Sequence, residues 1–310
     1  MTALTSVPAG QVRAQPGAPP NAQVLRRAAR WERLGLLVLV APALLLIAVT
    51  MLAPVGWLFY LSLLSDGGQW SFEHYQRMWE QPSYRRTFAT TFQVSLMTTG
   101  ICMLIGYPLA YCLSELPKRA ANLCMIAVML PLWTSLLVRT YAWLVLLQRK
   151  GLINGWGIAL GWWDEPLPLV HNLTGTLIGT VHVMLPFLIL PLYAGMRAID
   201  RDYLKAAANL GASPARGFWL VFLPLSLPGL TSGAVIVFIL CLGFYITPAV
   251  LGGGKVIMVS SRIANDIEVF FNWGAASALG VVLLAFTVAM VIATQRLMGA
   301  RGLLGGQETR

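Results

Sequence analysis

The sequence has 310 residues, of which 57% are hydrophobic and only 11% are charged. Ordinary soluble domains carry about 25% charged residues, so a water-soluble protein of this size could not cover its surface with so few charges. The same composition excludes a disordered chain, a coiled coil, a collagen-like protein and a disulfide scaffold. The chain is therefore predicted to be an all-α, polytopic membrane protein.

Residues 1–33 are predicted to form a disordered, basic cytoplasmic tail. Residues 1–30 are rich in Ala, Pro and Gln and show no apolar period. No cleavable signal peptide is expected, because the first apolar run begins only at Leu34 and is far longer than the apolar core of a signal peptide. The first transmembrane helix is predicted over residues 34–65. Its cytoplasmic start is favoured by the preceding arginines Arg26, Arg27, Arg30 and Arg33.

Six stretches are long and apolar enough to span a bilayer, which requires about 20 mostly apolar residues. Several contain proline, which packed membrane helices tolerate as a kink. The stretches are Leu36–Leu63, Thr90–Leu113, Leu123–Leu147, Leu173–Met196, Leu227–Leu251 and Ala275–Leu297. They leave an extracytoplasmic loop at 66–89, a core of five spans over 90–297 and a cytoplasmic tail at 298–310.

The distribution of basic residues supports six spans with both termini in the cytoplasm. In this topology the inner segments hold 14 cations and five acids, the outer segments hold seven of each, and Arg139 lies within a span. Lys and Arg collect in loops that stay inside the cell. The bias accounts for the net charge of +10, so a nucleic-acid partner is not needed to explain it.

Two outer loops are long enough to hold structure of their own. Leu152–Trp163 mixes apolar, glycine and tryptophan residues, which predicts a short helix in the membrane interface. Val256–Phe271 is predicted to contain a second short helix that carries Asp266 and Glu268. The four cysteines (Cys102, Cys112, Cys124 and Cys241) lie in or beside apolar runs without metal-type spacing and are interpreted as small buried hydrophobic residues.

The inner segment 197–228 is unlike a simple connector. Asp202 suits the start of a helix over Tyr203–Leu210, which contains three consecutive alanines. Gly211 follows where a C-terminal glycine is expected. Ser213 and Pro214 are typical of an N-cap and first turn, so a second helix is predicted from Ala215 towards Leu223, with Pro224 disrupting it. An ordinary amphipathic connector remains the alternative on these features alone.

The order of residues in this segment resembles the EAA loop of ATP-binding-cassette (ABC) importer permeases. That family's loop reads Glu-Ala-Ala-x3-Gly-x9-Ile-x-Leu-Pro and docks into a cleft of the ATPase subunit. This sequence has Lys205-Ala206-Ala207, then Gly211, then Val221 and Leu223-Pro224 at the same spacing. The resemblance implies a type I ABC importer permease fold in which Asp202, Tyr203, Lys205, Ala206, Ala207, Gly211, Ser213, Pro214, Leu223 and Pro224 couple to an ATPase.

Lys205 departs from the family pattern, because it replaces the usual Glu. A lysine cannot make the same ion pair with the ATPase, and Asp202, one turn away, is a candidate substitute. The steric part of the pattern, in which small residues enter the cleft and a glycine sets the angle between two helices, is intact.

A second resemblance concerns the solute. Residues 243–254 (GFYITPAVLGGG), followed by Asn265 and by 272–276 (NWGAA), resemble the spermidine/putrescine-type permeases. The likeness covers roughly Thr90 to Leu297. It implies a polyamine-like solute, while permeases for amino acid derivatives, opines and ferric iron belong to the same subfamily.

Candidate residues of the solute pathway carry charge or an aromatic face. Arg139 either extends to the interface or lines the pathway. The aromatic rings offer faces to a cationic amine but are more often packing residues, and the two acids either attract a polyamine or form a solvated helix face. The candidates are Trp133, Arg139, Tyr141, Phe244, Tyr245, Asp266 and Glu268. His182 is expected to hydrogen-bond to a neighbouring helix.

The chain is not expected to be an enzyme, and no cofactor or metal site is predicted in it. Gly252–Lys255 lacks the spacing of a phosphate-binding loop, so ATP and magnesium are expected on partner subunits. The resemblance implies an ATPase dimer, a second permease subunit and an extracytoplasmic solute-binding protein, assembled in the bacterial inner membrane. A stand-alone secondary carrier would require acids near the bilayer midplane, and a scaffold would not need paired inner helices.

Overall fold

The computed structural model describes residues 22–65 and 67–305, with side chains over 38–65 and 67–296. The regular structure of these residues is helical, apart from one antiparallel bridge between Leu64 and Trp70. The chain divides into two units, one ending at Trp57 and the other beginning at Leu58. The predicted all-α membrane fold is confirmed.

The first unit consists of most of helix α1 (Ala22–Ser62). Its part Val38–Ser62 is long and apolar enough to cross a membrane. Residues 22–33, predicted as disordered tail, are helical, because their Ala, Arg, Leu and Glu residues favour continuation of the helix beyond the apolar run. Residues 1–21 and 306–310 lie outside the described residues.

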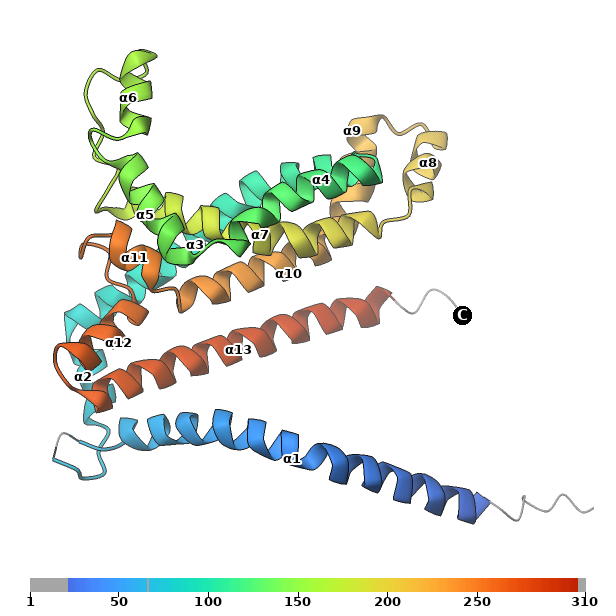
Figure 1. Cartoon of the computed structure of the whole chain (residues 1–310). Coiled ribbons are helices and arrows are strands. Elements are labelled where there is room, and N and C mark those ends of the chain that lie inside the picture. Colours follow the sequence, from blue (N-terminus) through green and yellow to red (C-terminus); the bar gives the residue numbers. More distant parts are fainter. Residues whose placement is uncertain (1–21, 66, 306–310) are drawn as a thin grey trace, which may run out of the picture. The chain divides into compact units, whose positions relative to one another are not determined.

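The second unit is built around three long helices (Figure 1). They are α3 (Pro82–Glu115), α7 (Leu173–Arg197) and α10 (Leu223–Leu242), and each pair is in contact. Their apolar side chains interlock, as Cys102 from α3, Leu188 from α7 and Val237 from α10 share one buried cluster. Internal prolines such as Pro108 and Pro186 leave α3 and α7 continuous. The fourth long helix of this unit is α13 (Trp273–Gly305).

The predicted third span is bent rather than straight. Helix α4 (Lys118–Met129) and the 3₁₀ turn η1 (Leu130–Trp133) are followed by α5 (Leu136–Leu147) and α6 (Leu152–Ala159), and the two arms meet at 96°. Pro131 cannot donate a helical hydrogen bond, and Thr134 has an extended backbone (ψ 153°). The described residues therefore give five candidate spans, or six with the bent pair.

The predicted fifth span also ends earlier than expected. Helix α10 stops at Leu242, and Ile246–Leu251 forms a separate short helix, α11, after a break at Gly243 to Tyr245. The Thr247 hydroxyl on α11 lies 3.2 Å from that of Thr140 on α5, and both are buried. The contact between these two hydroxyls holds α11 against α5, so Ile246–Leu251 does not continue α10.

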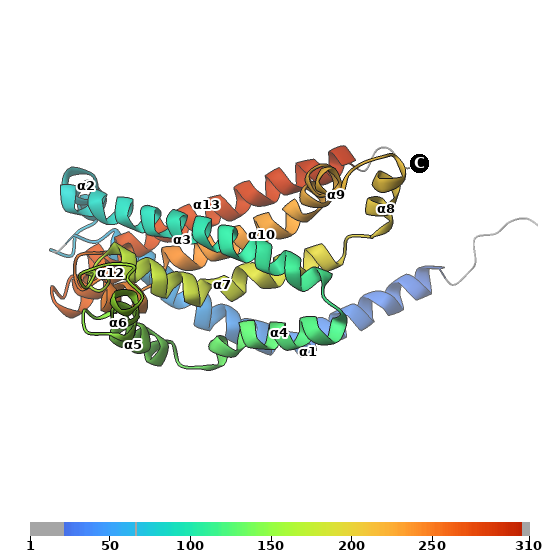
Figure 2. The same cartoon turned by 90° about the horizontal axis from the view of Figure 1, so that it is seen from above.

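The short helices of the second unit gather at its two ends (Figures 1 and 2). Helices α2 (Glu73–Glu80), α6, α11 and α12 (Val259–Glu268) lie at one end, called here the outer end. Helices α8 (Asp202–Asn209) and α9 (Pro214–Gly217) lie at the opposite end, with the turn between α3 and α4. The predicted inner and outer segments therefore separate to opposite ends of the helices.

Candidate functional site

The predicted helix pair at 197–228 is present and turns at Gly211. Helix α8 ends with the Ala212 N–H donating to the Ala207 carbonyl (3.0 Å) and the Gly211 N–H donating to that of Ala208 (2.9 Å). The φ of Gly211 is +85°, in the left-handed region that side chains avoid. The glycine predicted to end the helix therefore has the conformation that such an end requires.

Ser213 and Pro214 begin the second helix as predicted. The Ser213 hydroxyl accepts the Arg216 N–H at 3.4 Å, and Pro214 occupies the first turn of α9, where a missing N–H costs nothing. The short α9 leads directly into a π-helical turn, η2 (Phe218–Phe222).

Pro224 does not disrupt the second helix, contrary to prediction. The stretch Pro214–Leu242 is one continuous helical unit. Pro224 lies in the first turn of α10, directly after η2 and Leu223. A π turn widens the helix, which gives the proline ring the room that a regular α-helix would deny it.

Helix α8 projects from the end of the unit with no buried residue. Tyr203, Lys205 and Ala206 are exposed, and Ala207 is half-buried. Leu204 faces the opposite way, into a cluster with Phe218 and with Leu113 of α3. The segment therefore presents a polar and small-residue face outward while an apolar face anchors it.

Lys205 pairs with Asp202 inside α8 rather than with another element. Its Nζ lies 2.8 Å from Asp202 Oδ1, and both side chains are exposed. The hydrogen bond that Lys205 donates to Asp202 raises the pKa of the Lys205 ammonium above its ordinary 10.5, so the lysine stays charged at neutral pH. Asp202, the candidate substitute for the family's glutamate, is therefore already paired with Lys205.

Two arginines that are not among the predicted coupling residues fix the base of this segment. Arg197 and Arg201 both donate to the Ser114 carbonyl of α3, and Arg201 forms an ion pair with Glu115. The partners are more than 80 residues apart in sequence, so no local pattern points to them.

The aromatic pathway candidates lie on neighbouring elements, apart from Trp133. Tyr141 is on α5, and Phe244 and Tyr245 precede α11, which contacts α5. Tyr141 and Tyr245 are exposed, whereas Phe244 packs against the buried cluster of α3, α7 and α10. Trp133, 88% exposed, lies in η1 on the other side of the 96° bend.

Arg139 is half-buried on α5 and points inward. Its Nη2 donates weakly to the Thr134 carbonyl (3.4 Å), while its Nε and Nη1 are buried and reach no acceptor among the described residues. One helix away, His182 of α7 accepts the indole N–H of Trp143 at 3.0 Å. The expected hydrogen bond between His182 and a neighbouring helix is confirmed.

Asp266 is buried and not on a solvated helix face. It is 2% exposed, and its Oδ1 lies 3.0 Å from Arg262 Nε, while the Arg262 guanidinium lies over the Tyr84 ring at 4.8 Å. Burial raises the pKa of this carboxyl above its ordinary 3.8, opposed first by the charge of Arg262. Asp266 is therefore already paired with a cation of its own helix, whereas Glu268 on the same helix is exposed.

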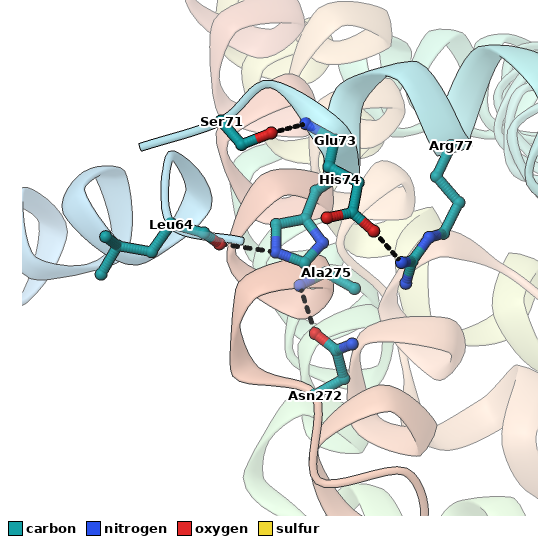
Figure 3. Close-up of polar contacts among 7 residues, drawn as sticks. All are labelled: Leu64, Ser71, Glu73, His74, Arg77, Asn272 and Ala275. Atoms are coloured by element: carbon teal, nitrogen blue, oxygen red, sulfur yellow. Dashed lines mark hydrogen bonds and ion pairs between the residues drawn. The ribbon is translucent and has the colours of Figure 1, made fainter. Parts of the chain in front are cut away.

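The 272–276 motif organises the outer end (Figure 3). The Asn272 side chain accepts the Ala275 N–H at 2.8 Å and so caps α13. His74 of α2 is buried and its Nε2 lies 2.8 Å from the Leu64 carbonyl. Gly274 lies against this imidazole, so close that a Cβ would approach Nε2 to 2.3 Å. The motif residues are therefore explained by packing at the outer end.

The outer loop after α5 is closed by one amide. Asn154 of α6 is fully buried; it donates to the carbonyls of Gln148 and Leu167 and accepts the Leu167 N–H, all within 3.0 Å. Trp156 and Trp162 are exposed on this outer loop. Exposed tryptophans suit the boundary between lipid and water.

Comparisons with known proteins identify the family. The family described as binding-protein-dependent transport system inner membrane component matches residues 34–299. The spermidine/putrescine transport system permease protein PotB of Haemophilus influenzae is 32% identical over 263 residues, covering 84% of this chain and 90% of the relative. PotB of Escherichia coli is 30% identical over 209 residues, covering 67% of this chain and 76% of the relative.

A solved structure shares the fold. A chain of a bacterial alginate ABC transporter, crystallised with an alginate pentasaccharide-bound periplasmic protein, superposes with a TM-score of 0.67 at 14% identity. The match covers 88% of this chain and 94% of that chain. The chain belongs to the binding-protein-dependent transport system inner membrane components and is the multi-pass permease subunit of an ABC importer of the inner membrane.

Proposed function

We propose that this chain forms half of the translocation pathway for a polyamine-like solute and receives the movement of an ATPase dimer through α8, α9 and η2. The polyamine part is supported by the PotB relatives, which are spermidine/putrescine permeases and match most of the chain. ATP and magnesium would be bound on the ATPase subunits, where the ATP would be hydrolysed.

The observation that carries the coupling role is the exposed α8 turning at Gly211. The motif residues Ala206 and Ala207 lie on the last turns of a helix that projects beyond the long helices. Small side chains there let a partner approach the backbone closely, and the left-handed glycine fixes the angle to α9. The exposed side chains of Tyr203, Lys205 and Ala206 take no part in the buried clusters that join α3, α7 and α10.

Movement of α8 has a short route to the long helices. Arg197 ends α7 only a few residues before α8, and α9 continues through η2 into α10. A closing ATPase dimer that displaces α8 would tilt α7 and α10 as rigid bodies, which is the kind of movement that alternating access requires. The pathway would be completed by a second, separately encoded permease, and an extracytoplasmic binding protein would deliver the solute.

The topology that this role requires places α8 in the cytoplasm. The charge bias of the sequence favours that side, and the last described turns of α13 lie at the same end of the second unit as α8. Both termini of the chain are accordingly proposed to be cytoplasmic.

A polyamine suits the exposed aromatic residues near α5 and α11. Tyr141 and Tyr245 present their rings on contacting elements, and aromatic faces attract ammonium groups. Of the two candidate acids, Glu268 is the one that exposes its carboxylate, because Asp266 is buried and paired with Arg262.

Gly211→Asp tests the coupling role. An Asp at φ +85° strains the backbone and adds a charge where the two helices turn. We expect loss of ATPase copurification and of ATP-dependent uptake, with normal membrane insertion. Retention of both activities would exclude the coupling assignment. The solute is tested separately by a thermal-shift screen of the cognate binding protein, in which spermidine or putrescine should raise the melting temperature and opines, amino acids and ferric iron should not.

A further inference from the structure

The C-terminal end of α3 lacks a backbone donor for one of its last carbonyls. The last four carbonyls of a helix have no partner within it. Here Leu116 turns into an extended conformation (ψ 149°) and Pro117, which has no N–H, follows it. The Ser114 carbonyl, on a residue that is itself buried, must therefore be satisfied from elsewhere.

Two arginines from the α7–α8 connection supply the donors. Arg197 Nη1 donates to the Ser114 carbonyl at 3.2 Å, and Arg201 Nη2 donates to the same oxygen at 3.1 Å. Arg201 Nη1 also donates to Glu115 Oε2 at 2.6 Å. The two cations face the negative end of the α3 dipole. The planar guanidinium of Arg201 thus binds a backbone acceptor and a side-chain acceptor of α3 at once, which fixes the orientation of the guanidinium.

This contact is poorly suited to a role in stability. The side chains of Arg201 and Glu115 are 52% and 38% exposed, and exposed ion pairs contribute little to folding. Its position is more informative, because Arg201 is the residue directly before α8. The contact joins the first turn of α8 to α3, a helix that is not adjacent to α8 in sequence.

A second contact joins the other side of the segment to the same helix. Tyr111, one turn before Glu115, packs edge-on against Phe218 at 5.3 Å and Phe222 at 5.1 Å between ring centroids. A cavity of about 280 Å³ beside this aromatic contact is lined by Tyr111, Leu204, Ala208 and Phe218, among others. The segment is thus attached to α3 at two separate contacts.

We propose that Arg201, with Arg197 and Glu115, is a positioning latch that makes α3 follow α8. A displacement of α8 then moves α3 together with α7 and α10, so that all three long helices respond to the ATPase. The inference rests on the proposed coupling role of α8. Without the latch, the ATPase still binds α8, but α3 follows α8 less closely, because only the aromatic contact of Tyr111 remains.

Contrary to the prediction that all four cysteines are buried, Cys112 and Cys124 are exposed. The native Cys112 reports on α3 directly, because it is a free thiol one turn before Glu115. The complete complex, with ATPase, second permease and binding protein, is reconstituted with Cys124→Ser in this chain to remove the other exposed thiol. The rate of maleimide modification of Cys112 is measured with and without ATP and vanadate. The variants are Arg201→Glu, Glu115→Arg and the two together, with Arg119→Ala, an exposed cation at the same end, as the control.

We expect nucleotide trapping to change the Cys112 rate in the wild type and in Arg119→Ala. Arg201→Glu and Glu115→Arg should each reduce the ATP-dependent change in the Cys112 rate about fivefold while ATPase copurification persists. The double variant should restore most of that change. An unchanged response in the single variants, or no response in a wild-type complex that holds its ATPase, would overturn the latch. Loss of the ATPase from every complex would instead count against the proposed docking role of α8.

Discussion

The Ala212 N–H donates to the Ala207 carbonyl across Gly211, whose φ of +85° closes the end of α8. A Cβ at position 211 would meet no atom within 4 Å, so substitution is opposed by backbone strain and not by a steric clash.

Gly211→Ala is therefore expected to cost about 1–2 kcal/mol, the cost of a left-handed conformation for a residue with a Cβ. Gly211→Asn should cost less, because Asn tolerates this region. The two variants should differ in ATPase copurification, with Asn closer to the wild type. Equal behaviour of the two would show that the turn does not depend on the left-handed glycine.

Lys205→Glu restores the residue type usual at this position in ABC importer permeases and replaces the pair with Asp202 by a repulsion. Both side chains are exposed, so the thermal unfolding temperature should hardly change. We expect association with the native ATPase to weaken, because a surface that accepts the Lys205 ammonium would then face a carboxylate. Copurification measured across a salt series tests this, and a loss of fold stability with normal association would contradict it.

Gly274→Ala should destabilise the outer end. The new methyl would meet His74 Nε2 at 2.3 Å, and the buried imidazole is held by the Leu64 carbonyl. Overpacking of this kind costs about 1–3 kcal/mol. Gly280→Ala on the same helix is the matched control, because no atom lies within 4 Å of its Cβ, and Ala is the better helix former. Thermal unfolding in detergent should separate the two, and His74→Ala should relieve the clash.

Asp266 gives the outer end a pH dependence. Since burial raises the pKa of its carboxyl in the folded state above the ordinary 3.8, the folded protein binds more protons in the interval above that value. The free energy of unfolding should therefore fall as pH rises through this interval. Asp266→Asn should flatten the profile, whereas Glu268→Gln, an exposed carboxyl on the same helix, should not. Identical profiles for the wild type and Asp266→Asn would exclude this role.

The parts of the fold that follow from local chemistry were predictable. Apolar runs identified the long helices, and the left-handed preference of glycine and the capping of Ser213 identified the turn between α8 and α9. The bend after Pro131 was missed because membrane helices such as α7 keep their prolines without breaking. A sequence does not show whether neighbouring helices support a kink or a turn.

Contacts between distant segments account for the remaining differences. The burial of Asp266 depends on Tyr84, far away in the chain, whose ring lies under Arg262. The Arg201–Glu115 pair depends on the parallel course of α3 and α7, which brings the C-terminal ends of both helices together. Hydrophobic period and charge counting contain no information about either pairing.

The measurement that tests the central claim most directly is whether Ala206 faces the cytoplasm and whether the bound ATPase covers it. Ala206→Cys, in a chain with Cys112 and Cys124 replaced by serine, is treated with a membrane-impermeant maleimide in intact cells and in inverted membrane vesicles. Labelling in inverted vesicles alone, with protection when the ATPase is bound, is the predicted result. Labelling from outside intact cells, or equal labelling with and without the ATPase, would contradict the account.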